Sequence, residues 1–483
     1  MESIWTKTCR IPKREPLQRD KNTEVAVIGA GMAGILIAYQ LQKAGKQVIL
    51  LEANRIASGQ TRNTTAKITS QHGLKYAALL SSHGEDQAQQ YAMANEEAIT
   101  AYRQIITEEK IPCDFQETAA FVYGQDKRKL MAEAEAAASL GISASFQSHA
   151  ETPFGIFPAL RFDGQAQFHP LKFIRHLAEQ LEIYEKTPVE TIDDHTLHTP
   201  KGKVTAEHIV FATHYPFVNF PGLYFARMHQ ERSYVLALKN APLTEGMFIG
   251  DGENNYSFRI YDKYLLFGGE GHRTGVNREG GKYAALRQKA KELFPDAQET
   301  AHWSAQDCMP VDGIPYIGRY AAGKPDWYVA TGFQKWGMTT SMVAALLLRD
   351  LICGKENPYV KVFDPQRFSM EAAEGIACEM KEATKTLARR FFKLPETTEQ
   401  ELPVGHGGIV EVDGDKIGVY KDEDGATYMV NIRCPHLGCQ LDWNPDEKSW
   451  DCPCHGSRFD FRGHLINNPA QEDIFLNKER PLP

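Results

Sequence analysis

The sequence has no block of basic residues and no long hydrophobic run. Its 483 residues include 54 Lys or Arg and 62 Asp or Glu, which gives a net charge of −8 at pH 7. A nucleic-acid-binding face needs concentrated Lys and Arg, so we expect no nucleic-acid partner. The longest apolar helix candidate, residues 342–352, contains Arg349 and Asp350 and is much shorter than a membrane span. We therefore expect no membrane span.

The N-terminal segment also lacks the apolar core of a signal peptide. Residues 1–22 form an extension with six Lys or Arg residues and no hydrophobic run, which a secretory signal would need. Five of the nine cysteines are scattered, as expected for reduced thiols: Cys9, Cys113, Cys308, Cys353 and Cys378. These absences predict a cytoplasmic protein.

The most informative stretch near the start is residues 24–52, EVAVIGAGMAGILIAYQLQKAGKQVILLE, which is typical of a strand, a turn, a helix and a second strand. Gly29, Gly31 and Gly34 fit G-x-G-x-x-G: the first permits the turn, the second lets the backbone approach a pyrophosphate, and the third allows close packing. Glu52 ends the second strand, where its carboxylate can accept hydrogen bonds from ribose hydroxyls. The pattern predicts a dinucleotide site. The alternative is an ordinary turn between a strand and a helix.

A polar stretch follows, residues 55–73, which is rich in Ser, Thr and Asn and has no periodicity. It could reach a flavin ring through its backbone and hydroxyls, or it could be a solvated connection. Lys67 is the ionisable residue in it that could lie near a reacting centre. Each interpretation places residues 55–73 outside regular secondary structure.

Between residues 232 and 271, four short strand patterns appear: SYVLAL, MFIGDG, YSFRIY and YLLFGGEG. They predict an antiparallel sheet inserted into the nucleotide-binding domain, where it would cover one face of a cofactor and form the substrate cavity. Arg259, Glu270 and His272 are candidates for lining that cavity, although each could instead be a surface or structural residue. Residues 327–339 predict a second strand-to-helix turn, whose positive helix end could point at a cofactor.

Residues from about 20 to 368 resemble the D-amino-acid-oxidase-type family of FAD oxidoreductases, which includes glycine oxidase and sarcosine oxidase. The resemblance rests on VIGAGMAG, Glu52, SGQTRNTTA, TPVETI, YLLFGGE and ATGFQKWGMTTS, in that order. It implies an α/β FAD-binding Rossmann-type domain with an inserted, mostly antiparallel β substrate domain, and FAD as the cofactor. The cofactor-binding residues that it implies are Gly29, Gly31, Met32, Ala33, Gly34, Glu52, Ala53, Thr65, Ala66, Val189, Gly332, Gly337, Met338 and Thr339. The chain shows no pattern for covalent flavin attachment and no matched clamp for a substrate carboxylate.

The resemblance also suggests how the chain is divided. We expect an FAD-dependent oxidoreductase domain at 23–368, with a nucleotide part at 23–80, 150–215 and 305–368 and a substrate-cap part at 81–149 and 216–304. Residues 369–398 are typical of a helical connector. Residues 399–483 contain short strand patterns separated by Asp-Gly pairs, which predict a small all-β domain.

This last segment contains CPHLGC at 434–439 and CPCHGS at 452–457, each of which offers a thiolate and an imidazole. In a Rieske [2Fe–2S] centre two Cys hold one iron and two His hold the other. A tetrahedral zinc site also accepts two Cys and two His, but its usual spacing differs, and it would leave Cys439 and Cys454 unexplained.

The segment resembles Rieske domains, specifically the type found in cytochrome bc complexes. The resemblance implies the cluster ligands Cys434, His436, Cys452 and His455, a disulfide between Cys439 and Cys454, and a hydrogen bond from Ser457 to a cluster sulfur. A disulfide across 15 residues is worth roughly 3 kcal/mol on the chain-entropy account. A second donor in these domains, a Tyr, is replaced by Phe459, so we expect a potential below the top of the Rieske range of roughly −150 to +300 mV. The two His ligands are expected at a solvent-facing tip.

Together these features predict an FAD-dependent dehydrogenase that oxidises the C–N bond of an amino acid or N-alkyl amine. Electrons would pass singly from the flavin to the [2Fe–2S] cluster and on to an external one-electron acceptor protein. Three alternatives stay open: an oxygen-using amine oxidase with an accessory Rieske domain, a Rieske-fed flavin reductase, and a non-enzymatic redox sensor. A Rieske oxygenase fits poorly, because the sequence has no evident 2-His-1-carboxylate iron domain.

Overall fold

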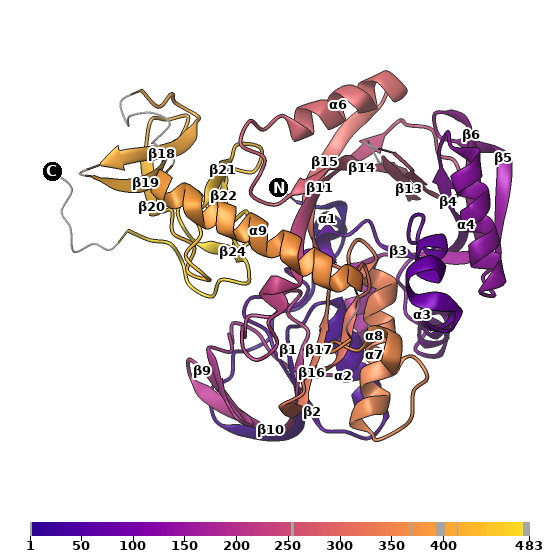
Figure 1. The fold of residues 1–483 in the computed structure, drawn as a ribbon, viewed down its shortest axis with the longest axis horizontal. Helices are drawn as coiled ribbons and strands as arrows, with labels where there is room; N and C mark the ends of the chain where they lie inside the picture. Colours follow the sequence, from indigo (N-terminus) through magenta and orange to yellow (C-terminus); the bar gives the residue numbers. More distant parts are fainter. Residues whose placement is uncertain (1, 253–255, 368–369, 393–400, 413, 477–483) are drawn as a thin grey trace.

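The computed structural model describes residues 2–252, 256–367, 370–392, 401–412 and 414–476. A large domain, residues 2–367, contains two extended sheets. A small β domain, residues 401–476, lies against one side of it, and the long helix α9 (Met370–Phe392) crosses between them (Figure 1). None of the helices in the described ranges is both long and apolar enough to cross a membrane.

The first sheet carries the dinucleotide motif and has the order β16-β17-β10-β1-β2-β7, with β9 and β8 added beside β10. Strands β2, β1, β10 and β17 pair parallel with one another in that order, whereas β16 and β9 pair antiparallel with β17 and β10. The last four residues of β1 and all of β2 are buried, as expected for parallel strands covered on both faces. The strands are β1 (Lys21–Ile28), β2 (Val48–Leu51), β7 (Glu182–Tyr184), β8 (Thr191–Asp193), β9 (Thr196–Thr199), β10 (Gly202–Phe211), β16 (Tyr316–Ala321) and β17 (Lys324–Thr331).

The second sheet has the order β15-β11-β14-β13-β12-β4-β6-β3, with β5 paired to β6. The four strands predicted between residues 232 and 271 are present as β11 to β14, and all of them pair antiparallel with one another in this sheet. The strands are β3 (Lys67–Ile68), β4 (Gln116–Tyr123), β5 (Ala144–Thr152), β6 (Gly155–Gln167), β11 (Met228–Lys239), β12 (Met247–Gly250), β13 (Ser257–Tyr261), β14 (Tyr264–Arg273) and β15 (Gln298–Pro310).

The division of the chain between the sheets differs from the expected one. Strand β6 lies in the second sheet, although we assigned residues 150–215 to the nucleotide part, and β15 runs on to Pro310, past the expected boundary at 304. Because β6 pairs with β4, the chain stays in the second sheet until residue 167. Residues 55–73 contain β3 and the 3-10 helix η1 (Gln60–Asn63), and residues 69–72 are buried, so the interpretation as a solvated connection is wrong.

Helices cover the sheets. Helix α2 (Met32–Lys43) packs on β1, β2 and α7 (Gly337–Ile352), and α4 (Lys127–Ser139) and α6 (Lys282–Leu293) pack on the second sheet. The remaining helices are α1 (Ile4–Thr8), α3 (Tyr76–Glu108), α5 (Pro170–Ala178), η2 (Tyr224–Ala226) and α8 (Val360–Phe363). The two sheets therefore meet at a central cavity, between the dinucleotide motif and the inserted strands.

The small domain consists of two short antiparallel sheets around a core that includes Trp450 and Phe459. The first sheet has β18 (Gly407–Val412), β19 (Asp415–Lys421) and β20 (Thr427–Asn431), and the second has β21 (Asp442–Asn444), β22 (Ser449–Asp451), β23 (Arg458–Asp460) and β24 (Leu465–Asn467). The two Cys/His segments lie in loops before β21 and before β23. The predicted all-β domain is thus present within residues 401–476.

Candidate functional site

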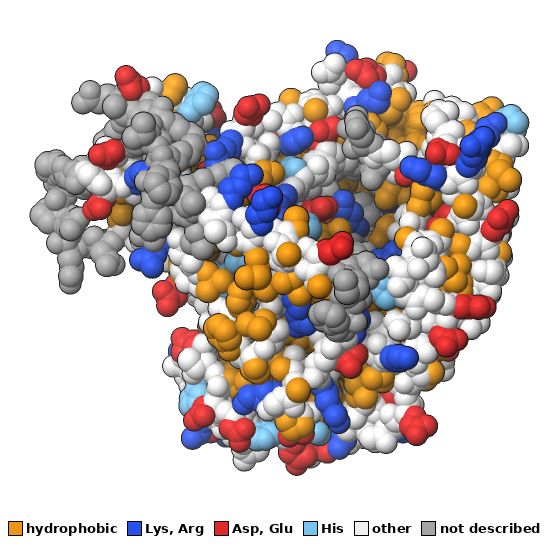
Figure 2. All heavy atoms as spheres, in the orientation of Figure 1, with side chains coloured by type: hydrophobic (Ala, Val, Ile, Leu, Met, Phe, Trp, Pro, Cys, Tyr) orange, Lys and Arg blue, Asp and Glu red, His pale blue; other side chains and the backbone are white. Residues whose placement is uncertain are grey.

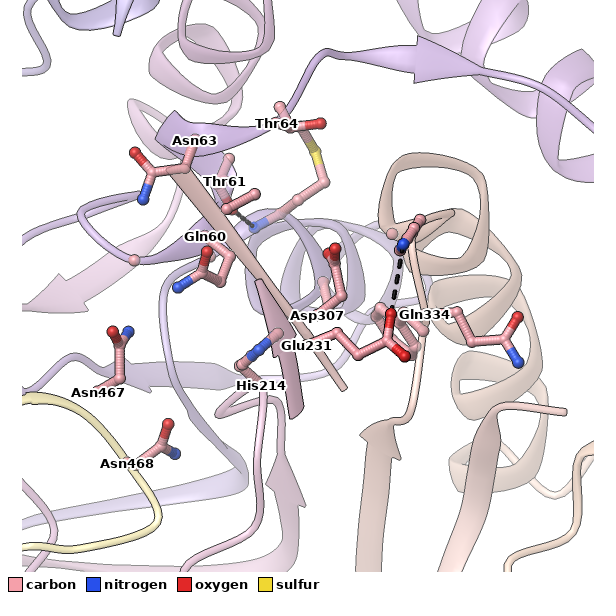
Figure 3. Close-up of a pocket in the computed structure, with 18 of the residues that line it drawn as sticks. Gln60, Thr61, Asn63, Thr64, His214, Glu231, Asp307, Gln334, Asn467 and Asn468 are labelled. Carbon is pink, nitrogen blue, oxygen red and sulfur yellow. Dashed lines mark hydrogen bonds and ion pairs between the residues drawn. The ribbon is translucent and has the colours of Figure 1, made fainter. Parts of the chain in front are cut away.

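A cavity of about 1380 Å³ lies where the two sheets meet. Its lining includes the turn after β1, the end of β2, strands β11, β14 and β15, the turn before α7, and residues 465–473 of the small domain, apart from Pro469. Figure 3 shows Glu231 and Asp307 close together among the lining residues, with Asn467 and Asn468 on the small-domain segment. The cavity is large enough for a dinucleotide, and residues of the small domain form part of its wall.

The glycine turn has the shape that a diphosphate requires. Gly29 has a φ of +102°, and a Cβ there would lie 2.6 Å from the carbonyl oxygen of Ala212. A Cβ on Gly34 would lie 1.8 Å from the oxygen of Gly29, so only glycine lets α2 pack this closely on the turn. The N–H of Met32, in the first turn of α2, donates to Thr61 Oγ1 at 2.9 Å. The N-terminus of α2 therefore opens into the cavity beside polar side chains from η1.

Glu52 is fixed at the end of β2. One carboxylate oxygen accepts a hydrogen bond from the N–H of Ala30 at 2.9 Å, and the other accepts one from the N–H of Asn54 at 2.8 Å. Burial raises the pKa of this carboxyl group above its usual range. Each oxygen keeps a further lone pair, and the residue lines the cavity, as a ribose-binding carboxylate must.

Most of the residues expected to bind the cofactor meet at this cavity. Those that line it are Gly29, Gly31, Met32, Ala33, Glu52, Ala53, Thr65, Val189, Gly337 and Met338. The other four are buried and each follows or precedes a lining residue in the chain: Gly34, Ala66, Gly332 and Thr339. Thr339, for example, bonds the backbone of Thr69 with its hydroxyl, donating at 2.9 Å and accepting at 2.8 Å. The set fits FAD, with the helix N-terminus at the diphosphate.

Of the catalytic candidates, Lys67, Glu270 and His272 line the cavity, and Arg259 does not. Lys67 donates to Ser257 Oγ at 2.6 Å and to the carbonyl of Phe248 at 3.1 Å, and burial lowers the pKa of its ammonium group to about 7. Glu270 faces Lys282 at 3.5 Å. His272 contacts Tyr234 OH at 3.0 Å, and burial lowers the pKa of its imidazole.

Arg259 is instead a buried structural residue. Its guanidinium donates to the carbonyls of Thr65 at 2.7 Å and Ala66 at 2.6 Å, and stacks over Trp5. Arg259 therefore fixes the backbone of residues 65 and 66 by binding their carbonyls. The expectation that it lines the substrate cavity is wrong.

Two acids of the cavity were not anticipated. Glu231 and Asp307 are paired residues of β11 and β15. Burial raises the pKa of the Asp307 carboxyl group to about 7, whereas the hydrogen bond from His229 lowers the pKa of Glu231 to about 2. Lys335, on the turn before α7, lies 3.3 Å from Glu231. Neither acid has a sequence signal beyond its place in a strand. Among the polar lining residues, Gln60, Thr61, Asn63 and Thr64 belong to the 55–73 stretch that was expected to reach a flavin, and Gln334 belongs to the 327–339 turn, whereas His214, Asn467 and Asn468 were not anticipated.

The Cys/His loops of the small domain form a second site. The rings of His436 and His455 are 4.9 Å apart between centroids, and their Nδ1 atoms are buried without a hydrogen-bond partner in the described part of the chain. His436 donates from Nε2 to Asn219 Oδ1 at 2.7 Å, so its Nδ1 carries a free lone pair, as a metal ligand needs. Cys434 and Cys452 are buried and free. Two thiols and two open imidazole nitrogens fit a [2Fe–2S] cluster.

Other features of this site agree with the resemblance to Rieske domains. Cys439 and Cys454 form the expected disulfide. The hydroxyl of Ser457 and the N–H groups of His436 and Leu437 reach the sulfur of Cys434. Phe459 is fully buried and provides no hydroxyl. The donors to the Cys434 sulfur thus include two backbone amides and the serine hydroxyl.

The cluster loops are not a free tip, which corrects our expectation. The 452–457 loop packs on β11 and β15: Gln230 donates to the carbonyl of His455 at 2.6 Å, and Gln306 donates to that of Gly456 at 2.8 Å. His455 is buried and His436 is only partly exposed. The interface also contains an ion pair at 2.6 Å between Arg232 of the large domain and Glu447 of the small domain.

Strands β11 and β15 separate the two sites. Successive side chains of a strand point to opposite faces, so Gln230 and Gln306 bind the 452–457 loop while their neighbours Glu231 and Asp307 line the cavity. The cavity and the cluster loop thus lie on the two faces of the same pair of strands.

Comparisons with known proteins agree with this division. Residues 24–351 match the family model described as FAD dependent oxidoreductase, and residues 393–478 match the Rieske [2Fe-2S] domain. The protein YhfW of Bacillus subtilis (strain 168), named as a Rieske 2Fe-2S iron-sulfur protein, is 36% identical over 488 aligned positions, which cover 97% of this chain and 96% of YhfW.

Two solved structures share the fold of the large domain. Glycine oxidase from Geobacillus kaustophilus has a TM-score of 0.60 and 19% identity, covering 72% of this chain and 99% of that chain. L-proline dehydrogenase from P. horikoshii has a TM-score of 0.60 and 17% identity, covering 72% and 98%. With its dinucleotide cavity and its Cys/His loops, the chain belongs to the FAD-dependent oxidoreductase family, binds FAD, and carries a C-terminal Rieske domain that binds a [2Fe–2S] cluster.

Proposed function

We propose that this oxidoreductase oxidises the C–N bond of an amino acid or N-alkyl amine and passes the electrons singly, by way of FAD and the Rieske cluster, to an external acceptor protein. When bound, the flavin supplies a two-electron acceptor and the cluster a one-electron carrier. The observation that supports the proposal is the shared pair of strands: β11 and β15 line the cavity on one face and bind the 452–457 loop on the other.

The protein groups between the two sites favour direct transfer. Sheets that pack face to face are about 10 Å apart, and strands β11 and β15 lie between Glu231 and Asp307 in the cavity and the 452–457 loop. Asn468 of the small domain also donates to the carbonyls of Thr213 at 2.9 Å and Tyr215 at 2.6 Å, beside the cavity. These contacts hold the small domain at one place on the large domain.

The charges of the cavity favour an amine without a carboxylate over an α-amino acid. Among the described lining residues the cations are lysines, Lys67, Lys282 and Lys335, with no arginine, so no bidentate guanidinium clamp is available for a carboxylate. Glu270 and Asp251 offer negative charge to a cationic substrate, and Asp307 does so above about pH 7, because burial raises the pKa of its carboxyl group to about 7. A substrate carboxylate could therefore pair only with lysine ammonium groups, which bind as point charges and not as a two-point fork.

The external partner would approach where a cluster ligand nears the surface. His436 is partly exposed, and the next residue, Leu437, has 40% of its surface exposed. Phe220, which follows the His436 partner Asn219, is 69% exposed. Figure 2 shows hydrophobic side chains gathered on the face beside α9. Asn219 and Phe220 belong to residues 213–227, and η2 in this segment contacts α9. An apolar rim around a partly exposed ligand would suit brief contact with a redox protein.

The test is an anaerobic titration of the holoprotein with amino acids and N-alkyl amines. Flavin bleaching would be followed optically, and cluster reduction by electron paramagnetic resonance. The proposal expects one compound to bleach the flavin and then raise the Rieske signal. Bleaching with an unchanged cluster, together with one peroxide per turnover in air, would instead indicate the oxidase. No bleaching by any compound would leave the reductase or the sensor.

A further inference from the structure

The large domain binds the 452–457 loop through four consecutive carbonyl groups. Arg273, the last residue of β14, donates from Nε to the carbonyl of Pro453 at 3.3 Å and from Nη2 to that of Cys454 at 3.2 Å. The next two carbonyls, of His455 and Gly456, accept the hydrogen bonds from Gln230 and Gln306. Every donor is a side chain of the large domain, and only Arg273 is charged.

The other ends of the same peptide groups point at a cluster ligand. The N–H groups of Cys454 and His455 are directed at the sulfur of Cys452. Each belongs to the same amide as one of the two carbonyls that Arg273 binds. A hydrogen bond at the carbonyl end of an amide polarises its N–H end, and chains of hydrogen bonds strengthen one another. The guanidinium therefore acts on both N–H···S hydrogen bonds to Cys452.

We infer that Arg273 of the large domain raises the reduction potential of the Rieske cluster by binding the carbonyls of Pro453 and Cys454. Reduction adds one electron to the cluster, and stronger hydrogen bonds to its sulfurs stabilise the added negative charge. A nearby positive charge acts in the same direction. A higher potential makes the cluster a better acceptor for electrons leaving the cavity. Arg273 is a positioning and tuning residue, since it acts through the 452–457 loop.

Glu379 of α9 holds Arg273 in this position. Its two oxygens accept from Nη1 at 3.0 Å and from Nη2 at 2.6 Å, a bidentate pair that fixes the plane of the guanidinium. Its Oε1 also lies 3.0 Å from His229 Nδ1. The carboxylate offsets part of the positive charge that the cluster experiences. Removing the negative charge of Glu379 should therefore raise the reduction potential, whereas removing the positive charge of Arg273 should lower it.

The experiment is a redox titration of the purified holoprotein, followed by electron paramagnetic resonance of the cluster. We expect Arg273→Met to lower the potential, with the equilibrium constant for reduction about tenfold smaller, which is about 59 mV for one electron. Glu379→Gln should raise it. The control is Arg278→Met. Arg278 also binds the small domain, through Asp442 at 2.5 Å, but within the described ranges it forms no hydrogen bond or ion pair with the 452–457 loop.

The inference is overturned if Arg273→Met leaves the potential unchanged, or if Arg278→Met lowers it equally, since the cause would then be a general loosening of the interface. If Arg273→Met fails to retain the cluster, Arg273→Lys is the deciding variant. A lysine keeps the positive charge but cannot donate to two carbonyls in the geometry of a guanidinium. A potential equal to that of the wild type then overturns the inference, and a lower potential supports it. The measurement needs the cluster but no substrate, so its outcome is independent of the proposed amine oxidation.

Discussion

Gly275 meets Pro453 across the interface of the two domains: a Cβ on Gly275 would lie 2.4 Å from the nitrogen of Pro453. Gly275 has a φ of +80°, and Pro453 lies between two residues of the 452–457 loop that belong to the cluster site. The distance leaves no room for any side chain at position 275. The close approach of the large domain to the cluster loop therefore depends on this glycine.

We expect Gly275→Ala to move the 452–457 loop away from β11 and β15 and so to slow reduction of the cluster after the flavin has been reduced. Stopped-flow absorbance of the two centres would measure both steps. Gly45→Ala is the matched control, because Gly45 also has a positive φ, +91°, but no atom of the residues that the structure describes lies within 4 Å of its added Cβ. Both variants should lose about 1–2 kcal/mol of stability for the left-handed backbone. Equal rates of cluster reduction in the two would contradict the prediction.

The two cofactor sites could be predicted from sequence because each is encoded by short-range spacing. Gly29, Gly31 and Gly34 are required by one turn, and the CPHLGC and CPCHGS motifs each bring a thiolate and an imidazole into one loop. Turn geometry and ligand spacing leave few other residue types possible at these positions. The second sheet was predicted for a related reason, since its strands show the alternation of half-buried surfaces.

The contact between the two domains produces no short-range spacing pattern in the sequence. Gln230 and His455 are 225 positions apart, and a glutamine in a strand looks the same in sequence whether it binds a loop or faces water. Asp307 was missed for the same reason. Arg259 was misplaced because its buried guanidinium serves backbone carbonyls, which sequence cannot distinguish from substrate. The expectation of solvent-facing His ligands was wrong for His455, which the large domain buries, whereas His436 stays partly exposed.

Lys67 should give the protein a pH-dependent stability. Its pKa is about 7 in the folded protein because of burial, against an ordinary value of 10.5. Between about pH 7 and 10.5 the unfolded chain therefore holds more protons than the folded one, so the free energy of unfolding rises with pH in this window. Lys67→Met should remove that rise and be most stabilising near and below pH 7. Urea unfolding of the holoprotein at several pH values measures it, with Lys282→Met as the control. An unchanged slope in Lys67→Met would refute the assignment.

Asp307 should act with the opposite sign and at lower pH. Burial raises the pKa of its carboxyl group from 3.8 to about 7, so between these values the folded protein holds more protons than the unfolded chain. The free energy of unfolding should then fall as the pH rises through this window. Asp307→Asn cannot ionise and should be more stable than the wild type above pH 7, with little difference near pH 4. Asp251→Asn, which changes another acid of the cavity lining, is the control. A constant difference across the whole range would show that packing, not ionisation, is responsible.

Phe459 should limit the potential of the cluster. It is fully buried in the small-domain core, pairs with Trp450 and Leu465 across the short sheet, and offers no hydrogen-bond donor. Rieske domains of the type that this segment resembles have a tyrosine here, whose hydroxyl reaches a cluster sulfur. Phe459→Tyr should therefore raise the reduction potential, because an added hydrogen bond stabilises the reduced cluster.

Phe461→Tyr adds the same hydroxyl beside Tyr420 and Tyr428, in the same domain, and should leave the potential unchanged. A titration of the wild type that already reached the upper end of the range of roughly −150 to +300 mV would contradict the account, because the missing donor would then have no effect. If Phe459→Tyr raises the potential and Arg273→Met lowers it, the two side chains act by different routes: the tyrosine through a hydrogen bond from its own hydroxyl, and the arginine through the amides that face Cys452. The double variant should then show the sum of the two shifts, since independent interactions add.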